Sequence, residues 1–166
     1  MYPIIHKIKQ GIDQVVLAVC SLAILTLVVT VTWQVFSRYV LNDPSSFTDE
    51  LARYTMIWFG LLGASYLFGK NGHLAITLFI SAVSEPLKKW AYLMINIVSL
   101  LFINLAMIKG GIQLIGRTMQ QFSPALQMPM AYVYLILPIA GVLMSVYIII
   151  NTLEVFSMNA VKEQSE

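Results

Sequence analysis

The chain has 166 residues, of which 58% are hydrophobic and only 11% are charged. Soluble domains are about 45–50% apolar and about 25% charged, so a water-soluble globule of this composition would expose apolar patches large enough to aggregate. The composition excludes a disordered chain and indicates that lipid covers most of the surface. A net charge of +2 without a basic cluster does not indicate a nucleic-acid partner.

Runs without charged residues predict an all-α integral membrane protein with four transmembrane helices. The first run, from Gln14 to Ser37, has 24 residues and as a helix would extend roughly 36 Å, which is enough to cross a bilayer. Barrel strands are about half as long and alternate polar with apolar residues, a pattern that this sequence lacks. The spans are expected at about residues 14–38, 48–69, 88–110 and 130–154, within a single membrane domain of residues 1–166.

The first span is predicted to be a retained anchor. The tetrapeptide that ends at Cys20 faintly resembles a lipoprotein cleavage box, but the apolar stretch continues for 17 residues beyond this cysteine. A removable leader has no such continuation. Trp33 and Tyr39, near the far end of the span, fit an interfacial aromatic belt.

A polar segment precedes and opens the second span. Ser46 followed by Asp49 predicts a serine-initiated helix with an acid near the positive end of its dipole. Glu50 and Arg53 are three residues apart and can pair on the helix surface. Together with Asp43 in the preceding turn, this segment is either a capped helix end with a boundary ion pair or a contact for a partner.

Small residues follow on the second span. Gly60 and Gly63 offer a face for close approach of another helix, a role that is favoured over ligand binding. His73 is predicted to lie in a loop at the membrane surface. Residues 74–83 are too short to span a bilayer and form either a short interfacial helix or a continuation of the second helix.

The last two spans carry signals for a kink and for helix contacts. Pro138 removes one backbone hydrogen bond and predicts a kink near Tyr134. Three asparagines in or near the spans need interhelical partners, either within this chain or in another subunit. They are Asn96, Asn104 and Asn151.

Lysine and arginine in the loops favour an orientation with both termini in the cytoplasm. With four spans, the termini and the second loop share one side and hold six such residues, against four on the other side. The six are Lys7, Lys9, Lys70, Lys88, Lys89 and Lys162, and the four are Arg38, Arg53, Lys109 and Arg117.

The middle of each expected span is free of ionisable residues. Such residues usually mark an ion or substrate path within a membrane, so neither autonomous ion coupling nor catalysis is expected. The sequence predicts no catalytic, metal or cofactor site. A self-contained, homo-oligomeric small transporter or channel remains the alternative.

The second span and its surroundings resemble a known family. The motif Asp49-Glu50-Leu51-Ala52-Arg53-Tyr54, followed by Trp58, Gly63-Ala64 and Gly72-His73, is similar to the signature region of the small membrane subunit of tripartite ATP-independent periplasmic (TRAP) transporters. The segment from Trp33 to Tyr39, and Ser123-Pro124 with Met128-Pro129, also resemble that family. Leu74-Ala75-Ile76-Thr77 departs from it by replacing an acid that often follows the histidine.

This resemblance implies a scaffold or accessory subunit in the bacterial inner membrane. Its partners would be the lipid bilayer, a large membrane subunit and a periplasmic substrate-binding protein, which together take up an organic acid such as a sialic acid or a C4-dicarboxylate with a sodium gradient. The candidate partner-contact or structural residues are Asp43, Asp49, Glu50, Arg53, Trp58, Gly60, Gly63 and His73.

Overall fold

The computed structural model describes residues 2–70 and 85–163. Apart from one bridge between Phe122 and Pro129, the regular structure of these residues is helical, which confirms the predicted all-α class. The helices are α1 (Tyr2–Tyr39), α2 (Ser46–Gly69), α4 (Glu85–Phe102), the π-helix η1 (Ile103–Lys109), α5 (Gly110–Thr118), α6 (Met130–Tyr134) and α7 (Ile136–Glu163). His73 and the segment 74–83, expected as a loop and an interfacial helix, lie outside the described residues.

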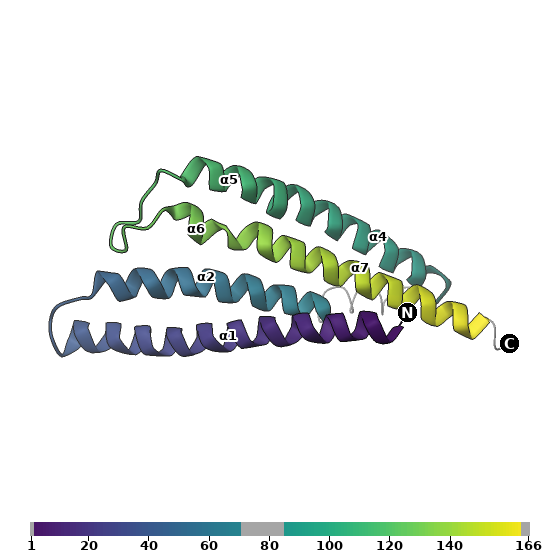
Figure 1. Ribbon diagram of the computed structural model, residues 1–166, viewed down its shortest axis with the longest axis horizontal. Helices are drawn as coiled ribbons and strands as arrows, with labels where there is room; N and C mark the ends of the chain where they lie inside the picture. Colours follow the sequence, from purple (N-terminus) through teal and green to yellow (C-terminus); the bar gives the residue numbers. More distant parts are fainter. Residues whose placement is uncertain (1, 71–84, 164–166) are drawn as a thin grey trace.

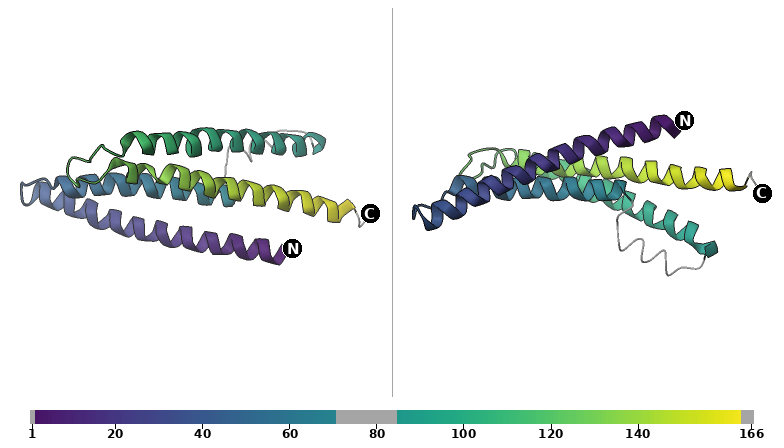
Figure 2. Two further views of the ribbon diagram at one scale, coloured as in Figure 1. Left: turned by 45° about the horizontal axis from the view of Figure 1, so that its top comes forward. Right: turned by 90° about the horizontal axis from the view of Figure 1, so that it is seen from below.

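The helices form an open layer rather than a closed bundle. Their order across the layer is α1, α2, α7 and then the continuous rod of α4, η1 and α5 (Figure 1). Among the described residues, the backbones of α1 and α2 do not approach that rod closely, although side chains of α2 and of the rod meet in one apolar cluster on α7. The left view of Figure 2 shows the α4–α5 rod on one side and α1 on the other, with α2 and α7 between them.

Three of these helices are long and apolar enough to cross a membrane. They cover Lys7–Tyr39, Trp90–Thr118 and Met130–Leu153. The third expected span therefore belongs to a helix that continues beyond residue 110 to Thr118. Residues 48–69 are helical as expected, within α2, but α2 is not among the described helices that are apolar enough to cross a membrane.

The polar start of α2 differs by one residue from the sequence prediction. The N-cap is Ser45 rather than Ser46, and its hydroxyl accepts a hydrogen bond from the backbone N–H of Thr48 at 3.4 Å. Asp49 lies in the first turn, where its charge complements the helix dipole. The turn before α2 contains Asn42 with φ of 53°, a left-handed conformation that asparagine tolerates better than most residues.

The predicted kink in the last span is present. Helix α6 ends at Tyr134 and α7 begins at Ile136, because Pro138 has no N–H to donate to the carbonyl of Tyr134. Glycines allow close packing at this break and at the π-helix: Gly111 of α5 lies against Pro138, and Gly141 of α7 lies against η1. A Cβ added at Gly141 would lie 2.8 Å from the Cγ1 of Ile108, so a side chain there would separate η1 from α7.

Two small apolar clusters form the core around α2 and α7. One contains Val16, Cys20, Leu62 and Ile136, and the other contains Ile103, Met144 and Ile148. Cys20 is buried within α1. Large apolar side chains on the outer faces of α1 and of the α4–α5 rod are exposed, as expected of surfaces that face lipid.

Candidate partner-contact site

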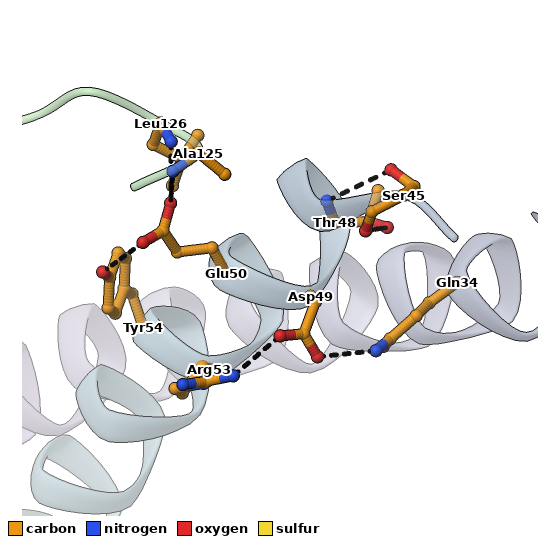
Figure 3. A network of polar contacts seen from close by, with 9 residues as sticks. All are labelled: Gln34, Ser45, Thr48, Asp49, Glu50, Arg53, Tyr54, Ala125 and Leu126. Atoms are coloured by element: carbon orange, nitrogen blue, oxygen red, sulfur yellow. Dashed lines mark hydrogen bonds and ion pairs between the residues drawn. The ribbon is translucent and has the colours of Figure 1, made fainter. Parts of the chain in front are cut away.

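A buried carboxylate joins α2 to the loop between α5 and α6. Glu50 is 8% exposed, and its carboxylate accepts hydrogen bonds from the Tyr54 hydroxyl at 2.7 Å and from the backbone N–H groups of Ala125 at 2.9 Å and Leu126 at 2.7 Å (Figure 3). All of these donors are neutral. Glu50 therefore acts as an acceptor that holds the loop on the helix.

The held loop, residues 119–129, is itself ordered by backbone hydrogen bonds. The N–H of Met130 donates to the carbonyl of Gln121 at 2.8 Å, and the N–H of Ser123 donates to that of Met128 at 3.0 Å. Ser123 is fully buried, whereas Phe122 is 59% exposed. The loop presents a defined outer surface without a charged side chain.

The predicted pairing of Glu50 with Arg53 is wrong. Arg53 instead donates to Asp49, four residues earlier, with 2.7 Å between Nη2 and Oδ2 (Figure 3). Residues four apart lie almost above one another on a helix, and Glu50 is turned toward the loop. The other oxygen of Asp49 accepts a hydrogen bond from Gln34 of α1 at 2.7 Å, so Asp49 connects the two helices.

A second buried carboxylate lies near the last residues of α2, far along that helix from Glu50. Asp13 of α1 accepts hydrogen bonds from Lys70, which follows α2, at 2.8 Å and from the Tyr147 hydroxyl of α7 at 2.7 Å. The hydrogen bond to Asp13 raises the pKa of the Lys70 ammonium. Nearby, Asn151 accepts from Lys9 and donates to the carbonyl of Phe68. Three helices are therefore tied together here.

Sequence reasoning missed this second cluster. Asp13 and Lys70 flank apolar runs and resemble ordinary boundary charges, while Tyr147 lies inside the last span. The one available signal was an acid at the very edge of the first span, where an unpaired carboxylate is costly. Its partners are 57 and 134 residues away in the sequence, so no local pattern identifies them.

Trp58 and the two glycines of α2 have different surroundings. The indole N–H of Trp58 donates to the carbonyl of Val133 at 3.2 Å, so this side chain ties α2 to α6. A Cβ added at Gly60 or Gly63 would meet nothing within 4 Å. The close approach predicted for these glycines is therefore not made within the described part of the chain.

The remaining predicted residues fall outside these contacts. Asp43 is exposed in the turn between α1 and α2, where its backbone N–H donates to the carbonyl of Ser37 at 3.1 Å. Of the three asparagines, Asn96 and Asn151 have the expected interhelical partners, Thr152 and the carbonyl of Phe68. Asn104 donates to Leu100 of its own rod and is exposed.

The open layer of long helices with exposed apolar faces defines a helical integral membrane protein. Residues 27–158 match the family described as the DctQ component of tripartite ATP-independent periplasmic transporters. The chain belongs to this family, whose members are small permease components of transporters and not enzymes.

Two relatives illustrate the similarity. A Haemophilus influenzae protein assigned to the TRAP transporter small permeases is 27% identical over 149 residues, which cover 90% of this chain and 89% of the relative. The sialic acid TRAP transporter small permease protein SiaQ of Vibrio cholerae is 28% identical over 106 residues, which cover 64% of this chain and 60% of the relative.

Proposed function

We propose that this chain is the scaffold subunit that braces the large membrane subunit of a TRAP transporter. With that subunit and a periplasmic substrate-binding protein, it takes part in the sodium-driven uptake of an organic acid across the bacterial inner membrane. Family membership supports the tripartite assembly, and the fold supports the scaffold role in the way argued below.

The proposal rests on an exposed stripe of residues along one face of α2, called the stripe below. This helix lies in the middle of the layer, yet Met56, Ile57, Gly60 and Leu67 on one of its faces are exposed. Small residues at such a position allow another backbone to approach closely. A helix of the large subunit would pack on this face, next to Gly60 and Gly63.

The disposition of the carboxylates supports a scaffold rather than a carrier. Asp13, Asp49 and Glu50 each bind groups of this chain. These bonds hold helices and a loop in place, so the three carboxylates have a structural role. Ion coupling and substrate movement are then assigned to the large subunit.

The proposed topology has four spans, with α2 as the second, and both termini in the cytoplasm. The start of α1 and the end of α7 lie at the same end of the layer (Figure 1), together with Lys9 and Lys70. Positive residues favour the cytoplasmic side. A reporter fused to the C-terminus should be active in the cytoplasm, and an outward-facing reporter would contradict this orientation.

Substitution of Gly60 tests the stripe. Gly60→Leu should leave the thermal stability of this chain unchanged, because there is free space at the position, but it should prevent co-purification with the large subunit. Val28→Leu, on an exposed part of α1, is the matched control and should co-purify normally. Intact complex formation with Gly60→Leu would show that the stripe faces lipid.

Uptake in proteoliposomes tests the function. With the large subunit and the binding protein present, a sodium gradient should drive the uptake of an organic acid. The sialic acid relative makes sialic acid the first substrate to measure, followed by C4-dicarboxylates. This chain alone should transport nothing, and sodium-driven uptake by it alone would favour a homo-oligomeric transporter instead.

A further inference from the structure

A pocket of 270 Å³ lies between the far end of α1 and the start of α2. Three of the residues that line it, Gln34, Ser45 and Asp49, are labelled in Figure 3. Its lining is about half polar and includes two hydroxyls, a carboxylate and a guanidinium. The lining residues are Gln34, Arg38, Pro44, Ser45, Ser46 and Asp49.

The two charged side chains that line this pocket, those of Asp49 and Arg38, differ in whether they have partners. Both oxygens of Asp49 are occupied, one by Gln34 and the other by Arg53, so an adjacent cation balances its charge. Arg38 has no hydrogen-bond or ion-pair partner among the residues that the structure describes, and it is exposed. The pocket therefore contains one uncompensated positive charge with five donor N–H groups.

The position of the pocket relative to the membrane indicates the kind of anion that would bind in it. Arg38 directly follows the charge-free run that ends at Ser37, so it lies at the boundary between hydrocarbon and headgroups. Below it on α1 are the exposed rings of Trp33 and Phe36, whose centroids are 5.9 Å apart. An anion here would have water on one side and an apolar helix face on the other.

We propose that this pocket binds the phosphate of a phospholipid headgroup, with Arg38 as the main ligand and the Ser46 hydroxyl beside it. The planar guanidinium can form two parallel hydrogen bonds to a phosphate. The acyl chains of the same lipid lie along the exposed face of α1. This site is independent of the proposed transport function, because lipid retention is measured without substrate, sodium or binding protein.

Native mass spectrometry of the purified membrane complex tests the site. The wild-type complex should retain phospholipid through extended detergent washing. Arg38→Gln should reduce the retained fraction about tenfold, which corresponds to one charge-assisted interaction. Arg38→Lys should give an intermediate fraction, because an ammonium keeps the charge but not the two parallel bonds.

Arg117→Gln provides the matched control. Arg117 is also an exposed arginine at the end of an apolar helix, and it too has no partner among the described residues, but it does not line the pocket. Its substitution should leave lipid retention unchanged. Equal losses in both variants, or equal retention in the wild type and Arg38→Gln, would overturn the site. Thermal melts of each variant verify that the fold is intact.

Inorganic phosphate separates the two sources of the anion. Phosphate added at millimolar concentration should not displace the retained lipid, because it lacks the apolar contacts. Displacement by phosphate would overturn the assignment to a lipid. A loss of binding-protein affinity in Arg38→Gln with unchanged lipid retention would likewise overturn it, and would indicate an acidic protein surface as the ligand.

Discussion

Asp13 and Glu50 are both buried carboxylates, one near each end of α2, yet their partners differ in kind. Asp13 binds one charged donor, Lys70, and one hydroxyl, Tyr147. Glu50 binds a hydroxyl of its own helix and two backbone N–H groups of a loop. The first cluster holds helices together, and the second positions a loop on a helix.

The difference determines what each site loses when its carboxylate is removed. Lys70 is about half exposed and can turn toward water, so part of the Asp13 cluster can recover. The N–H groups of Ala125 and Leu126 belong to the backbone and cannot leave the loop. A side chain bound by backbone donors therefore controls local order, whereas one bound by a lysine contributes mainly to the packing of helices.

The largest effect is expected from Glu50→Ala. Amide exchange at Ala125 and Leu126 should accelerate by at least about tenfold, because two backbone donors and the Tyr54 hydroxyl lose their common acceptor. Hydrogen–deuterium exchange of the peptide covering residues 119–129 measures this change. Asp43→Ala, in the neighbouring exposed turn, should leave the exchange of that peptide unaltered. Similar exchange in both variants would show that Glu50 does not hold the loop.

Asp13→Ala should lower the free energy of unfolding by about 3 kcal/mol, since the buried Tyr147 hydroxyl is left without an acceptor. Chemical denaturation in detergent measures the change. Lys70→Gln should cost less, because the lysine is partly in water. If Lys70→Gln proved as damaging as Asp13→Ala, the ion pair and not the hydroxyl would dominate this cluster.

Tyr147→Phe should have a smaller effect, about 1 kcal/mol, because only one hydrogen bond is removed. The ring keeps its packing against Gly69, where an added Cβ would lie 2.6 Å from the ring. The same denaturation experiment applies, combined with Asp13→Ala in a double-mutant cycle. Additive effects of the two substitutions would contradict a direct bond between these side chains.

The smallest effect on stability is expected from Arg53→Gln. The Arg53 side chain is largely exposed and that of its partner Asp49 is about half exposed, and such surface pairs contribute less than about 1 kcal/mol. Thermal unfolding of the variant should therefore match that of the wild type. A variant of normal stability that no longer supports uptake would assign Arg53 to a contact with another subunit.

Local features of the fold could be predicted from the sequence. Charge-free runs predicted the positions of the helices, and Pro138 predicted the break at Tyr134, because both depend on neighbouring residues. The start of α2 was displaced by one residue, since Ser45 and Ser46 are both capable caps. The third helix was predicted too short because Lys109 was taken as its end, although a lysine can extend its amine to the headgroups.

Contacts between distant residues could not be predicted in the same way. Glu50 was assigned to Arg53 because helix spacing considers only neighbours. Helix spacing also allows its bond to Tyr54, but its two backbone partners are 75 and 76 residues away. The arrangement of the helices in an open layer could not be predicted from the sequence either. An apolar helix face in a membrane protein has the same composition whether it contacts lipid or another helix, so hydropathy does not reveal which faces are covered.

The order of the helices across the layer has a consequence for assembly during synthesis. α1 with α2, and the α4–α5 rod with α7, each form a hairpin of consecutive helices, so each can close early during synthesis. Among the described residues, these two hairpins are joined by a seam in which α7 packs on α2 and touches α1, and this seam forms after both hairpins. Until then Asp13 has Lys70 as a partner but not Tyr147. Closure of the seam thus coincides with completion of this cluster, which makes the Tyr147–Asp13 bond a reporter of the final folding step.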